Sequence, residues 1–206
     1  MYYSQYGQDK WLDENIFRKK VDGFFLEIGA DDGIDKSNTL FFEEKGWNGI
    51  CIEPSPERYK LLKKNRACSC INVAISDSIE LVNFLDIKGW GKGLSGIIDS
   101  YNDEHKNRIK FELTNPQNKG SEIIKVKTNT IKNILNPFGI KNIDFCSIDV
   151  EGSEMKVLKS IDFSATFIKV IMIENNYSSN NVNTFLLQKG YDFLKKIEVD
   201  DIYILK

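Results

Sequence analysis

The chain of 206 residues is poor in arginine, histidine and cysteine. Its 28 basic residues include 4 arginines, and arginine is the side chain that proteins favour for bidentate contacts with phosphates and bases. The net charge is −2, so no overall basic field attracts nucleic acid or an anionic membrane. The sequence therefore predicts neither a nucleic-acid partner nor a membrane partner.

The four cysteines, Cys51, Cys68, Cys70 and Cys146, form no C-x-x-C pair and no cluster with the one histidine. This spacing argues against a disulfide framework or a zinc site, and free thiols are typical of a reducing compartment. The apolar runs are far shorter than the roughly 18 residues that span a bilayer. The first five residues lead into polar sequence rather than into a secretory signal. We therefore expect a cytoplasmic protein.

Short apolar runs alternate with helix-like segments along most of the chain. The predicted strands cover residues 24–28, 49–53, 70–75, 143–148 and 168–173, followed by a closing hairpin of 191–197 and 202–205. The predicted helices begin near residue 37 and at Pro56, and cover 153–161 and 181–189. This alternation is typical of an α/β protein whose parallel strands are joined by crossover helices.

One segment interrupts the alternation. Residues 86–120 are rich in Gly, Asn, Lys and Asp, and we expect them to be irregular. A connection of that length usually serves as a lid or as an inserted substrate-binding element. We therefore predict a single domain over residues 1–206 with a lid or substrate segment at about 86–120, in which Trp90 is available to stack on a sugar.

A glycine-rich turn, residues 29–33, follows the first predicted strand and precedes a helix, which is the context of a nucleotide-cofactor site in an open α/β sheet. The turn does not match the dinucleotide pattern G-x-G-x-x-G, because Asp31 stands two residues after Gly29. Asp31 and Asp32 would also repel a pyrophosphate. An acidic turn suits a cofactor with a cationic end, such as the amino group and sulfonium of S-adenosylmethionine.

Polar residues also end the next two predicted strands. Glu53 is placed to accept hydrogen bonds from both hydroxyls of an adenosine ribose, and Ser76 and Asp77 are placed to meet the adenine. The alternative is that the glycines only form a tight turn and that Glu53 is a solvated strand end. Three successive strands with matched polar ends favour the cofactor site.

Several motifs resemble those of FkbM-family methyltransferases. They are EIGADDG at 27–33, CIEP at 51–54, IDVEGSE at 148–154, the opening SQYGQD at 4–9, and LSG at 94–96 with His105. The resemblance covers nearly the whole chain. It implies a class I, Rossmann-like three-layer sandwich with a mostly parallel seven-stranded sheet and an antiparallel C-terminal strand. It also implies S-adenosylmethionine-dependent methylation of a hydroxyl, often on a sugar or a polyketide-like product.

The resemblance also assigns residues to the cofactor. Gly29, Glu53 and Asp77 match cofactor positions, and Asp149 matches the acidic end of the fourth strand, whereas the family commonly has Asn at position 31. The N-terminal segment is expected near the methionine end. The predicted cofactor-binding residues are Gln5, Gln8, Glu27, Gly29, Ala30, Asp32, Asn38, Glu53, Pro54, Ser76, Asp77 and Asp149.

Acidic and amide side chains follow the fourth and fifth strands. Adjacent parallel strands bring their carboxyl ends to one edge, so these side chains are expected to converge. One hypothesis is an Mg²⁺ site formed by Asp149, Glu174 and Asn175; the other, which we favour, is metal-free contact with cofactor or sugar. The predicted substrate-binding residues are Trp90, Ser95, Glu151, Glu174 and Asn175.

Methyl transfer is an in-line displacement in which alignment of the reactants supplies much of the rate. An acceptor hydroxyl must also lose its proton, so a general base contributes. His105 would titrate near neutral pH and is one candidate, although a solvated loop histidine fits the sequence equally; Asp149 is the other candidate. We therefore predict an O-methyltransferase that acts on a carbohydrate hydroxyl. An NAD-dependent oxidoreductase and a non-catalytic nucleotide-binding domain are the alternatives.

Overall fold

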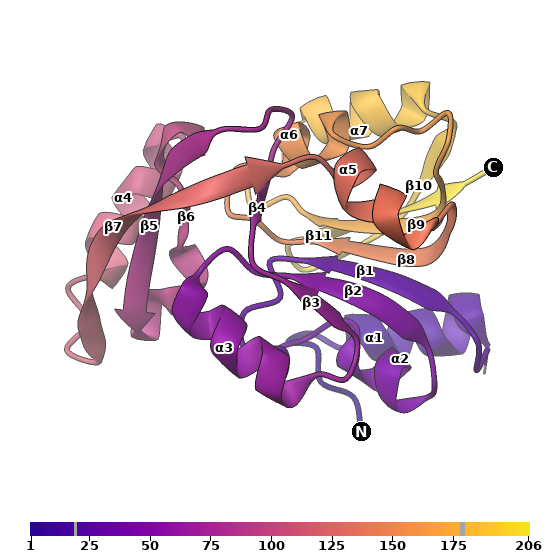
Figure 1. Ribbon diagram of the computed structural model, residues 1–206, viewed down its shortest axis with the longest axis horizontal. Helices are drawn as coiled ribbons and strands as arrows, with labels where there is room; N and C mark the ends of the chain where they lie inside the picture. Colours follow the sequence, from indigo (N-terminus) through magenta and orange to yellow (C-terminus); the bar gives the residue numbers. More distant parts are fainter. Residues whose placement is uncertain (19, 178–179) are drawn as a thin grey trace.

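Two β-sheets organise the residues that the computed structural model describes, which are 1–18, 20–177 and 180–206 (Figure 1). The strands of the larger sheet are β1 (Phe24–Ile28), β2 (Asn48–Ile52), β3 (Ser69–Ile71), β8 (Asn142–Ile148), β9 (Phe167–Glu174), β10 (Tyr191–Ile197) and β11 (Asp200–Leu205). The strands of the smaller sheet are β4 (Ala74–Ile75), β5 (Leu81–Gly89), β6 (Gly96–Ile97) and β7 (Asn118–Asn129).

The helices are mostly short. They are α1 (Gln8–Leu12) with the π-helical turn η1 (Asp13–Phe17), α2 (Leu40–Glu44), α3 (Pro56–Asn65), η2 (Trp90–Leu94), η3 (Ile98–Ser100), α4 (Asp103–Glu112), α5 (Ile131–Leu135), η4 (Asn136–Phe138), α6 (Glu154–Lys159) and α7 (Asn180–Gln188). Within the described part of the chain, none of them has the length and apolar character needed to cross a membrane.

The larger sheet has the strand order β10-β11-β9-β8-β1-β2-β3. β1, β2, β3, β8 and β9 run parallel, whereas β11 pairs antiparallel with both β9 and β10. The predicted mostly parallel seven-stranded sheet with an antiparallel C-terminal strand is therefore confirmed.

Helices cover both faces of this sheet (Figure 1). Successive side chains of a strand point to opposite faces, so each strand contributes to two cores. Leu26 and Ile28 of β1 pack with buried residues of α5, α6 and α7. Phe25, between them, packs instead with Leu12, Phe42 and other buried residues on the α1, α2 and α3 side. The three layers follow from this alternation.

The strand predicted over residues 70–75 is divided between the two sheets. β3 ends at Ile71, and the Nδ2 of Asn72 then donates to the backbone oxygens of Glu53 (2.8 Å) and Pro54 (3.0 Å). The following strand, β4, pairs with the end of β7 in the smaller sheet. The single predicted strand was therefore wrong, because the Asn72 contacts turn the chain away from the larger sheet.

The segment 86–120, predicted to be irregular, is largely regular. β5 and β7 pair antiparallel from Leu81↔Lys127 to Gly89↔Asn118, with η2, β6, η3 and α4 between them. Most of β7 is exposed, so its strand carries lysine and other polar residues on a solvated face. Because these strands lack long apolar runs, the sequence pattern did not predict them.

The carboxyl ends of β1 and β8 approach each other closely. Gly29 follows β1 with a φ of +86°, and a Cβ built on it would lie 1.7 Å from the backbone oxygen of Asp149. The Asp149 N–H donates to the carbonyl of Ile28 (3.0 Å), which holds the two strand ends at this distance. Only glycine satisfies both the left-handed conformation and the contact.

Replacement of Gly29 by Ala should therefore destabilise the protein far more than the same change at Gly139. Gly139 also has a positive φ (+63°), but a Cβ there would meet no described atom within 4 Å. Gly139→Ala should cost about 1–2 kcal/mol of unfolding free energy, the penalty for an L-residue in this conformation. Gly29→Ala should cost at least about 3 kcal/mol, as expected for a forced backbone clash. Urea unfolding of both variants measures the difference, and equal losses would contradict the packing argument.

Candidate functional site

A cavity of about 770 Å³ lies between the two sheets. Its walls are the carboxyl ends of β1, β2, β8 and β9 on one side, and β4, β6, η2 and part of α4 on the other, with the N-terminal segment at one end. Cofactor sites are commonly of this size and position in open α/β folds. The predicted site residues that line the cavity are Gln5, Glu27, Gly29, Ala30, Asn38, Glu53, Pro54, Trp90, Ser95, Asp149, Glu151 and Glu174.

Glu53 is buried at the end of β2, in the cavity wall. Its carboxylate accepts the backbone N–H groups of Asp31 (3.0 Å) and Ser55 (2.8 Å), which ties the acidic turn to β2. Burial raises the pKa of Glu53 to about 8, although the charge of Arg58 opposes the shift. A carboxylate has acceptor positions beyond these two bonds, so Glu53 can receive further hydroxyl donors.

The charges of the acidic turn are compensated by the protein itself. Asp31 lies 2.7 Å from the Nζ of Lys92 and 3.4 Å from the Nε of Arg58. The Oδ1 of Asp32 accepts the backbone N–H groups of Ile34 and Asp35 (both 2.9 Å), and Asp32 is not among the described residues that line the cavity. The predicted direct role of Asp32 at the cofactor is thus not supported, because its carboxylate closes the turn.

Glu27 lines the cavity, but its carboxylate is already engaged. It accepts hydrogen bonds from the hydroxyls of Ser37 (3.0 Å) and Thr39 (2.8 Å), from the Asn38 N–H (3.1 Å) and from the Nη1 of Arg66 (2.9 Å). These contacts hold residues 37–39 outside α2, which is why the helix begins at Leu40 rather than near residue 37. The carboxylate of Glu27 fixes this wall of the cavity.

The N-terminal segment is folded by two of its own polar residues. Asp9 is buried and accepts the N–H of Tyr3 (2.6 Å) and the hydroxyl of Ser4 (2.5 Å). Gln8 is also buried: it accepts the Tyr6 N–H (2.8 Å) and donates to Asp200 (2.5 Å). Gln8 therefore does not line the cavity, contrary to the prediction. It holds the N-terminal segment in place, and Gln5 and Tyr6 of that segment line the cavity.

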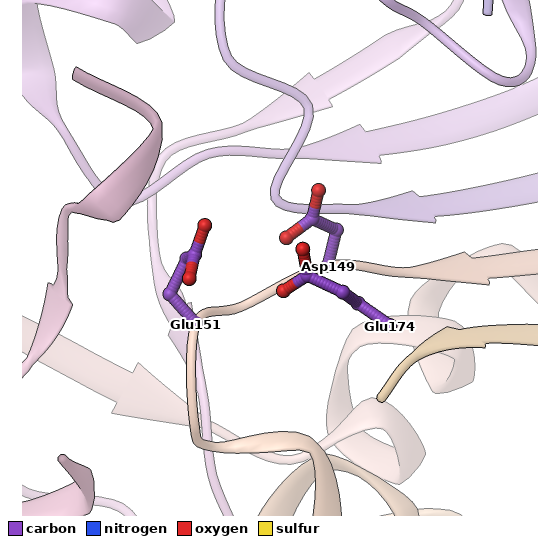
Figure 2. Close-up of side chains that lie close together, drawn as sticks. All are labelled: Asp149, Glu151 and Glu174. Carbon is purple, nitrogen blue, oxygen red and sulfur yellow. The ribbon is translucent and has the colours of Figure 1, made fainter. Parts of the chain in front are cut away.

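Three carboxylates converge at the ends of β8 and β9 (Figure 2). Asp149, Glu151 and Glu174 each have an oxygen within 4.8 Å of one in the other two. Asp149 faces the open cavity while the protein surrounds it on the other sides, and burial, with the charges of Asp200 and Glu154, raises its pKa to about 7. Burial and then the charge of Asp149 raise the pKa of Glu151 and of Glu174 well above the ordinary range.

Asn175 does not join this cluster. Its Nδ2 donates to Asp201 (2.7 Å), and its N–H donates to the carbonyl of Val199 (2.8 Å), so β11 holds it away from the cavity. The predicted Mg²⁺ ligand set of Asp149, Glu174 and Asn175 stays a prediction: Asp149 and Glu174 lie together with Glu151, while the Asn175 amide nitrogen is engaged by Asp201. The predicted substrate contact of Asn175 is not supported by its position.

Ser76 and Asp77 are also outside the cavity lining. The Ser76 N–H donates to the carbonyl of Asn129 (3.0 Å), because residues 74–75 belong to the smaller sheet. Val73 and Ile75, from the same segment, line the cavity instead. The division of the predicted strand at Asn72 accounts for this difference in position, and the predicted adenine contact of Ser76 and Asp77 stays a prediction.

His105 lies in a helix rather than in a loop. It is buried in α4, its ring stacks on Tyr101 with 4.5 Å between centroids, and burial lowers its pKa. Its Nδ1 lies 3.1 Å from the Tyr177 hydroxyl and 3.5 Å from the Oε2 of Glu151. His105 is not among the described residues that line the cavity, so a direct contact with a ligand is not supported.

The predicted substrate residues in the smaller sheet have different roles. The Ser95 hydroxyl accepts from the Ile87 N–H (3.0 Å) and from Arg58 (2.8 Å) and donates to the Lys92 carbonyl (2.8 Å), so it joins β5 and η2 to α3. Trp90 is 59% exposed at the cavity mouth, and its indole N–H donates to Glu112 (2.9 Å). Trp90 is therefore more than half exposed, whereas the Ser95 hydroxyl is fully engaged.

Four cations of the cavity lining were missed from the sequence: Lys36, Arg58, Lys92 and Arg108. The last three come from elements other than the strand ends, and only the assembled fold brings them to the carboxylates. Arg108 lies three residues after His105, so a helical interpretation of residues 103–112 would have placed both on one side of α4. For Arg58 and Lys92 the sequence contains no comparable signal.

Comparison with known proteins agrees with this geometry. A family model described as "Methyltransferase FkbM domain" matches residues 27–193. A TehB-like SAM-dependent methyltransferase from Corynebacterium glutamicum is similar in structure, with a TM-score of 0.52 and 8% identity over 98% of this chain and 89% of the other. M. capricolum TrmK, solved with S-adenosyl-homocysteine, has a TM-score of 0.42 and 10% identity over 96% and 66% of the two chains. The curated proteins contain no match. The fold is that of the class I methyltransferases, as predicted.

Replacement of Glu53 by Gln should weaken binding of S-adenosylhomocysteine about tenfold or more, because hydrogen bonds to a charged group contribute roughly 1.5–3 kcal/mol each. Since the pKa of Glu53 is raised to about 8, ribose binding to the carboxylate must release a proton at lower pH. The affinity of the unaltered protein should therefore increase as the pH rises from about 6 to 8. Calorimetric titration at several pH values measures both effects.

The control for this experiment is Glu112→Gln, which removes a carboxylate from the cavity mouth. It should leave the affinity and its pH dependence unchanged. In the unliganded protein, folding favours the neutral form of Glu53, so its contribution to stability is full at acid pH and is lost as the pH rises through about 8. An affinity for S-adenosylhomocysteine that is unchanged in Glu53→Gln would remove Glu53 from the site.

Proposed function

Because the chain belongs to the FkbM methyltransferase family and is therefore an S-adenosylmethionine-dependent methyltransferase, we propose that it methylates a hydroxyl group of a sugar, within a glycan or a glycosylated product. The observation that carries the proposal is the cavity between the sheets. One end of it has the features of a cofactor site, and the other combines clustered carboxylates with an exposed indole.

The cofactor end is formed by residues of the larger sheet. Glu53 has free acceptor positions for the ribose hydroxyls, and the Oδ1 of Asn38 is buried without a described hydrogen-bond partner. At the turn after β1, Gly29 and Ala30 expose backbone atoms and little side-chain volume to the cavity. Ile75 offers an apolar surface to the adenine. S-adenosylmethionine fits these residues, and when bound it supplies the electrophilic methyl group.

The acceptor end is formed by the carboxylate cluster and the cavity mouth. A sugar presents several hydroxyl donors close together, and Asp149, Glu151 and Glu174 offer several carboxylate acceptors in a matching volume. The exposed ring face of Trp90 at the mouth suits stacking on the apolar face of a pyranose. In this proposal Asp149 lies where the cofactor and acceptor ends meet.

The chemistry that we propose needs no bound Mg²⁺, since alignment and proton acceptance by the chain's own groups account for transfer. The cysteines that the structure describes are free thiols, which supports the cytoplasmic location predicted from the sequence. An NAD-dependent oxidoreductase is disfavoured by Asp31 at the turn, where a pyrophosphate would require close approach to the backbone.

The proposed function is tested by ligand binding and then by transfer. S-adenosylhomocysteine should raise the melting temperature, because a ligand that binds only the native state stabilises it by RT ln(1 + [L]/Kd), whereas NAD should not. Incubation with radiolabelled methyl donor should then label glycosides in a panel of methyl glycosides, oligosaccharides, phenols, amines and aliphatic alcohols, with and without EDTA. Label in amines or phenols alone would overturn the sugar hydroxyl as acceptor, and loss of label with EDTA would overturn metal-free transfer.

A further inference from the structure

The turn after β8 holds Glu151 in an unfavourable backbone conformation. Glu151 has a φ of +54°, which is uncommon for a residue with a side chain, and Gly152 follows with a φ of +106°. A Cβ on Gly152 would lie 3.0 Å from the carbonyl oxygen of Ser100, so the turn is packed against η3. The Gly152 N–H donates to Glu154 (2.9 Å), which fixes the turn from the α6 side. Backbone strain of this kind is often concentrated at functional positions.

The conformation of the turn places the Glu151 carboxylate in the cavity wall. The side chain is 9% exposed, and its Oε2 has no hydrogen-bond partner among the described residues. Burial of a carboxylate oxygen without a hydrogen-bond donor destabilises the folded state. Such an oxygen is therefore typical of a site where a ligand supplies the donor. The Oε2 lies on the His105 side, and an acceptor hydroxyl that enters from the mouth can donate to the carboxylate from the cavity side.

The other candidate bases are less well placed. Asp149 lies beside the turn after β1, where the cofactor and acceptor ends meet, but its carboxylate is already hydrogen-bonded to Glu174. In Figure 2 the carboxylates of Asp149 and Glu174 lie together, and Glu151 faces them from the turn after β8. His105 is behind Glu151, with its Nδ1 3.5 Å from the Oε2. Glu151 is therefore the carboxylate between the acceptor side and the histidine.

We propose that Glu151 is the general base of the transfer, an assignment that rests on the proposed function. The acceptor O–H bond breaks and its proton passes to the Glu151 carboxylate, which lies in the cavity wall. The oxygen's electron pair forms the new bond to the methyl carbon, while the bond from that carbon to sulfur breaks and leaves its electron pair on the sulfur. The products are the methyl ether, neutral S-adenosylhomocysteine and protonated Glu151, which returns its proton to solvent when the products leave.

His105 acts as a positioning residue for this base. Its Nδ1 lies near the Oε2 of Glu151 and the Tyr177 hydroxyl, and its ring is fixed by Tyr101. The titratable and charged groups that face Glu151 from the surrounding elements are Tyr101, His105, Arg108, Asp149, Glu154, Glu174 and Tyr177. Acidic neighbours and burial raise the pKa of Glu151, while Arg108 opposes the shift, so the basic form gains population as the pH rises.

The central test is Glu151→Gln, which keeps the shape of the side chain and removes the base. With the best acceptor from the panel, kcat should fall about 10²–10⁴-fold, the usual contribution of a general base. The KM for the acceptor and the affinity for S-adenosylhomocysteine should change less than about threefold, because the amide oxygen of Gln can still accept a hydrogen bond from the acceptor hydroxyl and neither quantity depends on proton transfer. The unaltered enzyme should show a kcat that rises with pH, and the variant should not.

The matched control is Glu104→Gln, which removes the same charge from an exposed position of α4 and should leave kcat unchanged. A Glu151→Gln enzyme that retains kcat and its pH dependence would overturn the base assignment. A rise in KM without a fall in kcat would show that Glu151 only binds the acceptor, which would also overturn it. A large fall in kcat on a non-carbohydrate hydroxyl would support the base while refuting the sugar.

A second measurement does not need an acceptor. Glutamate labelled with ¹³C at the carboxyl carbon allows the pKa of Glu151 to be followed by NMR in the complex with S-adenosylhomocysteine, with Glu151→Gln used to assign its signal. The proposal expects a pKa raised above the ordinary carboxyl value, as for a buried carboxylate without a donor. An ordinary value would overturn the proposal even if the panel yields no acceptor.

Discussion

The contact between Gly29 and the backbone of Asp149 brings the ends of β1 and β8 closer than any side chain would allow. This approach places the turn after β1, with its bond to Glu53, beside the turn after β8, with its carboxylates. The two halves of the cavity, one suited to the cofactor and the other to the acceptor, thereby share a wall. Methyl transfer requires this proximity, because the acceptor oxygen must meet the methyl carbon in line with the sulfur.

The smaller sheet completes the site through charge. The strand ends supply mainly carboxylates. Burial raises the pKa values of these carboxylates where nearby cations offset the effect of burial only weakly. Arg58 bonds to Asp31 of the acidic turn and to Asp86 and the Ile87 carbonyl of β5. Lys92 joins η2 to the same turn. The site is consequently formed between the two sheets, and loss of either cation would loosen the cavity as well as change its charge.

The sequence was sufficient to predict the larger sheet, because its strands are buried apolar runs separated by helices and its first turn needs glycine. It also identified Glu53 and Asp149 as cavity residues, since strand order places their positions at one edge. The smaller sheet was missed, because a sheet with a solvated face lacks long apolar runs. Asn72, which ends β3, carries no signal that distinguishes its side-chain contacts with Glu53 and Pro54 from those of an ordinary strand residue.

Side-chain partners account for most of the differences between the predicted and the observed surroundings of the site residues. The motif residues Glu27, Gln8 and Asp32 were assigned to the cofactor, but each is engaged within the protein, by Arg66, Asp200 and the acidic turn respectively. Their partners lie far along the chain or depend on a turn conformation, so spacing alone could not assign them. Glu151 was predicted as a substrate residue, but its strained turn and unpartnered oxygen become visible only in three dimensions.

The central claim is that the cavity holds the cofactor on the larger sheet and leaves the carboxylate cluster open to the acceptor. A crystal structure of the complex with S-adenosylhomocysteine tests it directly. We predict the ribose hydroxyls on Glu53, the adenine against Ile75, the sulfur near Asp149, and Glu151 facing unoccupied space towards Trp90. S-adenosylhomocysteine bound elsewhere, or covering Glu151 so that no acceptor could reach it, would contradict the account.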